Sequence, residues 1–195
     1  MAEGLAAIAV GTPVSATGGV SRAPLGTGGV VGFDTTLPAG FVQVGRISED
    51  GLTENYEVET EKVKDWAGKT VKILKTDSSL TYEFTVLESS NADNLRFLYG
   101  EENVDVDEAT GDISVDITGD MLPAQEFAFT MREGSNGPGR RIHVPYGQPT
   151  MSSEVSYVNN DVIKYTVTVD ALSDDAGVMA RVFLADGTTE AIVTP

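Results

Sequence analysis

The chain has 195 residues, no cysteine and a formal net charge of −17 at pH 7. This length suits one domain with extensions, and the lack of cysteine excludes disulfides, thiolate zinc sites and cysteine nucleophiles. Because 30 acidic residues stand against 13 basic ones, the surface repels phosphate backbones, so we expect no tight binding to nucleic acid. The acidity favours solubility, with a surface tailored to face a polyanion as the alternative. No run approaches the ~18 apolar residues that a membrane helix requires, so we predict no membrane insertion.

The start of the chain is rich in glycine, alanine, threonine and serine, with almost no charged or aromatic side chains. Such a segment buries too little apolar area to offset the loss of backbone entropy on folding. We therefore predict a flexible N-terminal arm over residues 1–38, with residues 1–32 mobile in the free chain. The folded domain is expected over residues 39–195.

An acidic segment follows the arm. Seven acidic residues lie between Glu49 and Asp65, against two lysines, and the apolar periodicity is weak. These features predict an extended loop or a long hairpin over residues 46–68 that reaches away from the domain.

Alternation of apolar and polar residues indicates strands in the rest of the chain. Residues 80–86 place four large apolar side chains on one face, and the same pattern recurs at 113–117, 127–131 and 163–169. Shorter candidate strands lie at 41–47, 70–75, 140–146, 178–184 and 188–193. About nine or ten strands separated by turn signals are typical of a sandwich or barrel, so the predicted fold class is mainly β.

One helix is predicted over residues 90–99. Ser90 is placed to cap it, Asp93 lies in its first turn, and Gly100 provides a stop. Because the helix leaves directly from a strand, its apolar face is expected to cover an open edge or end of a β-sandwich. The segment 101–120 that follows holds eight acidic residues and no basic one.

The motifs that carry chemistry are all incomplete. Gly68-Lys69-Thr70 lacks the glycine that a phosphate-binding loop needs at Val63, and a strand pattern follows it instead of a helix. The acids of residues 105–112 miss the spacing of a calcium loop. The sole histidine, His143, supports neither a multi-histidine metal site nor a serine triad, and we interpret it as a strand residue facing polar surroundings. We predict no catalytic, metal or cofactor site.

The order of several short motifs resembles the tail tube subunits of bacteriophages that infect actinobacteria. In the first half these motifs are residues 45–52, the acidic run that ends in Asp65-Trp66-Ala67-Gly68, and residues 80–88 followed by a helix and Tyr99-Gly100. In the second half they are Pro145-Tyr146-Gly147, Val155-Ser156-Tyr157, residues 163–168 and Asp174-Asp175-Ala176-Gly177. The resemblance covers residues 33–187, while the long glycine-rich start departs from the shorter lead of that family.

Resemblance to the major tail tube proteins of long-tailed, siphovirus-type phages implies a tail-tube β-sandwich flanked by one α-helix, without enzymatic activity or cofactors. It implies hexameric rings that stack into a tube, which is the conduit for double-stranded DNA during ejection. The implied partners are further copies of the chain, the tape measure protein, and the tail tip and terminator proteins. The implied location is the virion tail, after assembly in the host cytoplasm.

The resemblance also implies roles for particular residues. It makes the long segment a ring-stacking loop, whose candidate contact residues are Arg46, Ser48, Glu49, Asp50, Glu54, Glu57, Glu59, Asp65 and Trp66. Acidic residues on polar strand faces become candidates for the wall of the channel, where they would keep DNA from sticking, for example Glu83 and Asp116.

Two alternatives stay open. One is a free β-sandwich module that binds carbohydrate or another ligand, which would need an exposed aromatic platform; aromatic residues make up only 7% of the chain. The other is a different tail or injection-tube component of similar fold, such as a tail terminator, a distal tail protein or the tube of a contractile injector.

Overall fold

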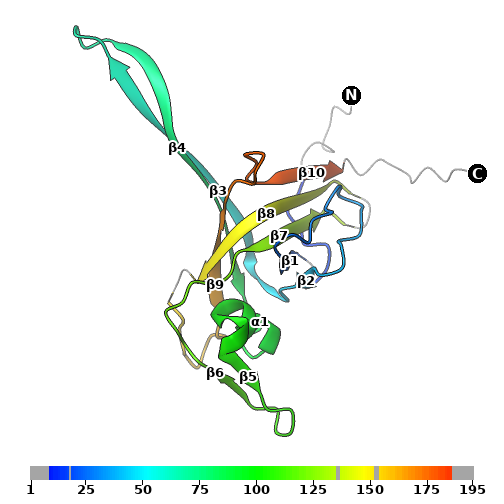
Figure 1. Cartoon of the computed structure of the whole chain (residues 1–195). Helices are drawn as coiled ribbons and strands as arrows, with labels where there is room; N and C mark the ends of the chain where they lie inside the picture. Colours follow the sequence, from blue (N-terminus) through cyan, green and yellow to red (C-terminus); the bar gives the residue numbers. More distant parts are fainter. Residues whose placement is uncertain (1–8, 18, 135–136, 152–153, 186–195) are drawn as a thin grey trace, which may run out of the picture.

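The computed structural model describes residues 9–17, 19–134, 137–151 and 154–185. Within these residues the chain is mainly β with one α-helix (Figure 1), which confirms the predicted fold class. The strands are β1 (Val20–Pro24), β2 (Val42–Gln43), β3 (Ile47–Lys64), β4 (Thr70–Val86), β5 (Val104–Val106), β6 (Ile113–Val115), β7 (Gln125–Arg132), β8 (Gly139–Met151), β9 (Tyr165–Ala171) and β10 (Arg181–Ala185). The helix is α1 (Ala92–Tyr99), followed by a short 3-10 turn (Glu101–Asn103).

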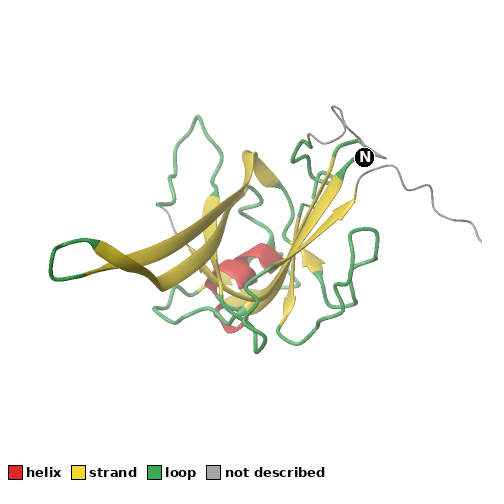
Figure 2. Ribbon diagram, turned by 90° about the horizontal axis from the view of Figure 1, so that it is seen from above, coloured by secondary structure: helices red, strands yellow, loops and turns green. Residues whose placement is uncertain are grey.

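The main sheet has the strand order β2-β1-β7-β8-β9-β4-β3, and β10 also pairs with β8. All of these pairings are antiparallel. The long strand β8 has two partners on one edge, because its first half pairs with β10 and its second half with β9. Strands β5 and β6 form a separate small sheet. Seen from above, the strands curve round the helix, which lies in the middle of the view (Figure 2).

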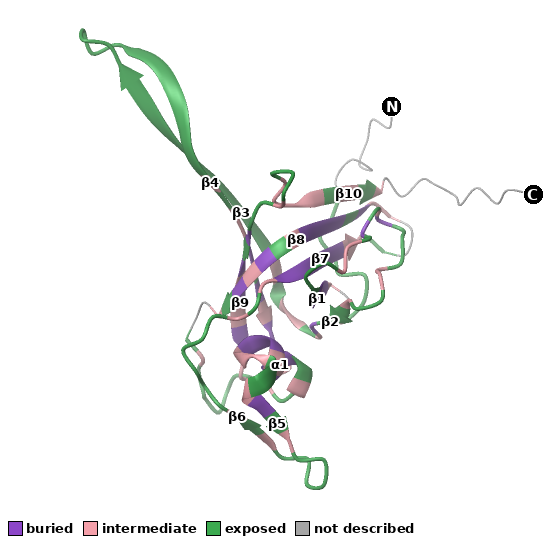
Figure 3. Cartoon of the chain, in the orientation of Figure 1, coloured by how far each residue is buried: buried purple, intermediate pink, exposed green. Residues whose placement is uncertain are grey.

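The core lies between the curved sheet and the helix (Figure 3). Period-two alternation turns Phe84 of β4, Phe129 of β7 and Val167 of β9 into it, each at most 2% exposed. From the helix, Phe97 is buried with its ring 6.1 Å from that of Phe127. Burial of a phenylalanine contributes roughly 1.5–3 kcal/mol, so this contact fastens α1 over one end of the sheet.

The helix begins two residues later than the sequence predicted. Asn91, not Ser90, is the N-cap, because its side-chain oxygen accepts the backbone N–H of Asp93 at 3.0 Å. The predicted stop at Gly100 is confirmed. Its φ of 101° lies in the left-handed region, and its N–H donates to the carbonyl of Arg96.

Strand boundaries also differ from the alternation pattern. Residues 70–75 and 80–86 belong to one continuous strand, β4, because pairing with β3 continues through the polar residues between them. A register shift near Thr60 breaks the alternation without ending the strand. Strand β2 is much shorter than the predicted 41–47, and the predicted strand at 188–193 lies outside the described residues.

The start of the chain is not wholly an arm outside the fold. Strand β1 pairs with β7 along its length, and Val20 is 3% exposed in the core. Within the segment predicted as an arm, residues 20–24 thus form a strand of the main sheet, held by pairing with β7. Residues 1–8 lie outside the described part of the chain.

Candidate functional site

The dominant surface feature is the hairpin formed by β3 and β4, which extends far beyond the rest of the molecule (Figures 1 and 3). Near the body it is anchored, because Leu52 pairs with Phe84 of the core. From residue 53 to residue 77 every residue is exposed. The tip is closed by a turn in which the Asp65 side chain accepts the Lys69 N–H at 2.8 Å. The predicted long hairpin is therefore present, and it is longer than residues 46–68.

Large apolar side chains lie along this exposed hairpin. Trp66 at the turn is fully exposed, and Tyr56, Val71 and Ile73 are each more than half exposed. A two-stranded ribbon is marginally stable in water by itself, and exposed apolar groups gathered on one element mark interaction surfaces. The hairpin is therefore the candidate interaction surface of this chain.

Charge divides the hairpin into two parts. The proximal part of β3, residues 47–59, carries five acidic residues and no basic one. We call residues 60–76 the hairpin tip; it has two acids and five lysines, Lys62, Lys64, Lys69, Lys72 and Lys75, all exposed. Its local formal charge is +3 in a chain of −17. Sequence reasoning missed this because it ended the segment at residue 68 and so counted only the outgoing strand.

The residues predicted to stack rings are spread along the whole of β3 and its ends. Arg46 precedes the strand, and its backbone N–H donates to Glu88 at 3.0 Å. Asp65 and Trp66 lie in the turn at the far end. The others lie on the strand between these positions: Ser48, Glu49, Asp50, Glu54, Glu57 and Glu59. The structure therefore does not gather them into one patch.

A second surface is the polar face of the sheet formed by β8, β9 and β4. Glu83 is exposed there and lies opposite Thr168, which in turn lies opposite Thr150. The hydroxyls of Thr85 and Thr166 are 3.0 Å apart. The opposite face of the same strands is apolar core, so this face lies on the outside of the single chain.

Asp116, the other predicted channel residue, does not share that face. It follows β6 of the small sheet, and its backbone N–H donates to the Asn103 carbonyl at 2.8 Å. The structure therefore separates Asp116 from Glu83.

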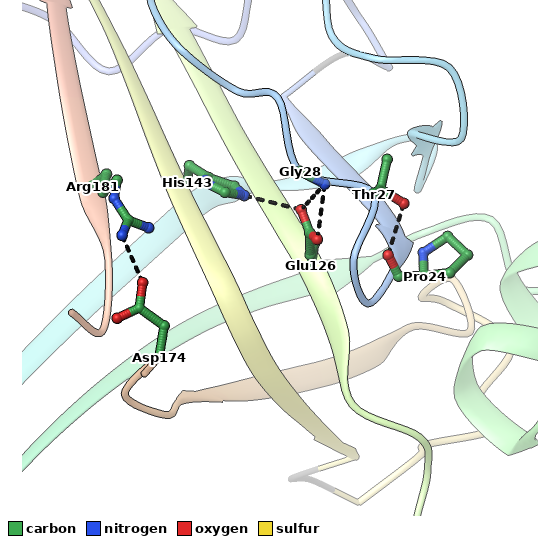
Figure 4. A network of polar contacts seen from close by, with 7 residues as sticks. All are labelled: Pro24, Thr27, Gly28, Glu126, His143, Asp174 and Arg181. Atoms are coloured by element: carbon green, nitrogen blue, oxygen red, sulfur yellow. Dashed lines mark hydrogen bonds and ion pairs between the residues drawn. The ribbon is translucent and has the colours of Figure 1, made fainter. Parts of the chain in front are cut away.

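A buried polar cluster lies on the side of β7 and β8 away from the core. The Glu126 carboxylate accepts the Gly28 N–H, at 3.0 and 3.1 Å to its two oxygens, and lies 3.2 Å from Nε2 of His143 (Figure 4). Both side chains are almost completely buried. Burial lowers the pKa of His143, although the hydrogen bond to Glu126 opposes that shift. His143 does face a polar group, as the sequence indicated, but inside the molecule.

The same face holds the segment between β1 and β2 in place. Arg141 donates to the carbonyls of Gly32 and Thr35, at 2.8 and 2.5 Å, and Arg132 pairs with Asp34 at 2.7 Å. Phe33 lies beneath the Arg132 guanidinium, 4.5 Å from ring centre to Cζ. Through these contacts Arg141 and Arg132 hold residues 32–35 against the sheet, so we assign the cluster a structural role.

Within the described ranges, no group of three or more histidine, aspartate or glutamate side chains is placed to hold a metal ion. No helix in the same part of the chain is both long enough and apolar enough to span a membrane.

Comparison with known proteins gives one family match. The family model described as "Phage tail tube protein" matches residues 9–194, almost the whole chain. Among solved structures, the cap that terminates the tube of the anti-feeding prophage aligns with 95% of this chain and 100% of its own, at 12% sequence identity and a TM-score of 0.47. A search of curated proteins finds no match.

Proposed function

Because the chain belongs to the phage tail tube protein family, we propose that it is the repeating subunit of a tail tube, closing into hexameric rings that stack around a channel for double-stranded DNA. The family is structural, so the chain is a structural component of a phage tail and not an enzyme. The sequence resemblance supports a long-tailed phage of actinobacteria as its source, and assembly in the host cytoplasm before it joins the virion.

The exposed β3–β4 hairpin is the observation that carries this proposal. A free monomer would leave Trp66, Tyr56 and Ile73 in water, which is unfavourable by roughly 25 cal/mol for each Å² of apolar surface. A neighbouring copy of the same chain in a tube would cover them. The sequence-predicted stacking residues lie along this hairpin and are proposed to contact adjacent subunits.

The polar face of β8, β9 and β4 is proposed as the wall of the channel. If six copies place these three strands side by side, the pooled sheet reaches the roughly 16–18 strands that already leave an aqueous channel. Threonines and acids such as Glu83 and Asp170 would line it. An acidic wall repels the DNA phosphates, so DNA would pass without binding. The tape measure protein and the tip and terminator proteins are the proposed further partners.

Negative-stain electron microscopy of the purified full-length chain at high concentration tests the proposal. We expect stacked rings or tubes. Monomers alone would contradict it and favour a ligand-binding module. Single rings that never stack would instead favour a terminator or another tail component of similar fold.

A further inference from the structure

The hairpin tip holds five lysines against two acids. Among the ion pairs that the structure describes, none includes any of the five lysines of residues 60–76. The apolar groups beside them, Trp66, Val71 and Ile73, are at least 59% exposed. An interface made by this tip would therefore be both cationic and apolar, and its partner must be acidic with apolar groups of its own.

One surface of this chain has those properties. We call residues 101–120, which include β5 and β6, the acidic end. It has eight exposed acids and no basic residue: Glu101, Glu102, Asp105, Asp107, Glu108, Asp112, Asp116 and Asp120. Of these, only Glu101 has an ion pair in the described structure, with Arg96 at 3.5 Å. Ile117 is 77% exposed, and Met121 beside this segment is 83% exposed.

The two surfaces lie at opposite ends of the molecule. In Figure 1 the tip of the β3–β4 hairpin is at the upper left, and β5 and β6 are at the bottom, beyond α1. A contact between different surfaces is heterologous, and its repetition builds an open filament unless the rotation between copies closes a ring. The positions of the two surfaces, as well as their charges, are therefore suited to a row of copies that extends along one axis.

We propose that successive copies of this chain join head to tail, with the cationic hairpin tip of one copy docked on the acidic end of the next. This inference rests on the proposed tube function and names the two surfaces that would join its rings. Opposite charges steer the approach and fix which surfaces meet, while Trp66 and Ile73 of one copy cover Ile117 and Met121 of the other.

Charge reversal tests the pairing in the full-length chain. The tip variant carries Lys62→Glu, Lys64→Glu and Lys72→Glu; the end variant carries Asp105→Lys, Glu108→Lys and Asp112→Lys. All six side chains are exposed, so circular dichroism should show unchanged folding. The tip variant turns the tip from +3 to −3, so that like charges face each other, and the end variant reduces the charge of the acidic end from −8 to −2 and so weakens the attraction. Each variant should raise the concentration needed for tubes by at least about tenfold.

A matched control reverses three exposed acids elsewhere, Glu133→Lys, Glu154→Lys and Asp175→Lys. It changes the net charge as much as the end variant does, and it should assemble like the wild type. Assembly should also weaken as salt rises, since exposed charges are screened beyond ~10 Å at 0.1 M salt.

Several results would overturn the inference. Tube formation at the wild-type concentration by either triple variant would refute the pairing while leaving the proposed function intact. Equal loss in the matched control would assign the effect to net charge. If the tip reversals abolish binding of a double-stranded DNA probe but leave tubes unchanged, the tip is a polyanion site. Lack of tubes in the wild type would refute the proposed function itself.

Discussion

His143 and Glu126 lie side by side beneath the segment that joins β1 to β2, and this burial makes the stability of the fold depend on pH. Burial, together with the positive Arg181, lowers the pKa of His143 below its ordinary value of 6.5, while Glu126 opposes the shift. The unfolded chain therefore takes up the proton first as pH falls. Stability should be complete above pH 6.5 and should fall, by at most ~1.4 kcal/mol per pH unit, as pH drops through that value towards the folded pKa.

Urea unfolding of the wild type and of His143→Gln, between pH 7.5 and 5, measures this effect. The variant removes the titrating group, so its free energy of unfolding should change less over the same range. Asp107 and Asp174 also have lowered pKa values. They change the free energy of unfolding only at lower pH, because the ordinary pKa of aspartate is about 3.9. Parallel curves for the two proteins would show that His143 is not the group responsible.

Gly147 marks a close approach of two side chains in the core. A methyl group at this position would lie 2.6 Å from the Phe127 ring and 2.7 Å from Val169. Gly147→Ala should therefore destabilise the fold by ~1–3 kcal/mol, the usual result of overpacking. Gly119→Ala is the matched control, because its added methyl would meet nothing within 4 Å. Equal unfolding midpoints for the two variants would contradict this account of the packing around Gly147.

At the scale of the element, we expect the β3–β4 hairpin to matter for assembly and little for folding. Residues 53–77 are all exposed, so they contribute little to the core. Replacing residues 58–78 by Asn-Gly joins the paired residues Glu57 and Ser79 through a two-residue turn that suits antiparallel strands. The shortened chain should unfold thermally close to the wild type, and by electron microscopy it should form no tubes.

Removal of residues 48–65, in contrast, would take away the partner of β4 on one edge, leaving only β9, and would delete Leu52, which packs against the core. That deletion should destabilise the fold and serves as the comparison. Long tubes formed by the chain that lacks residues 58–78 would show that the exposed hairpin is not needed for stacking.

The sequence predicted those elements whose apolar residues follow a period. The buried half of β4, and β7 and β9, were found because one face of each is core. The return strand of the hairpin was only partly recognised, because both of its faces are exposed over residues 70–77 and exposed strands need no apolar alternation. The lysines on that strand, which decide the charge of the tip, were missed for the same reason.

The burial of certain polar side chains could not be predicted from the sequence either. Glu126 and Arg141 occupy the polar positions of alternating strands, which suggests a face in water, yet both are less than a tenth exposed. Their partners are backbone groups of residues 28–35, which no sequence pattern pairs with them. The same contacts explain why a glycine-rich segment, expected to be mobile, is held against the sheet.

On the scale of the whole molecule, positive and negative charges are concentrated in different regions. The hairpin tip is positive, the base of β3 is acidic, and the acidic end lies beyond the helix. Two further exposed acids, Glu83 and Asp170, lie on the polar face of β4 and β9. In a ring, that face repeats once for each copy, so one substitution there changes the charge of the proposed channel wall in every copy.

Glu83→Lys should therefore convert a repelling wall into one that retains DNA. Glu83 is exposed and opposite Thr168, so the substitution should leave the fold and the tubes intact. Tubes of the variant should bind a fluorescent double-stranded DNA in sedimentation at low salt and release it as salt rises, because each phosphate contact releases counterions. Glu133→Lys, outside that face, makes the same charge change and should bind less DNA. Equal binding by the two variants, or none by either at low salt, would mean that the face around Glu83 does not line the channel.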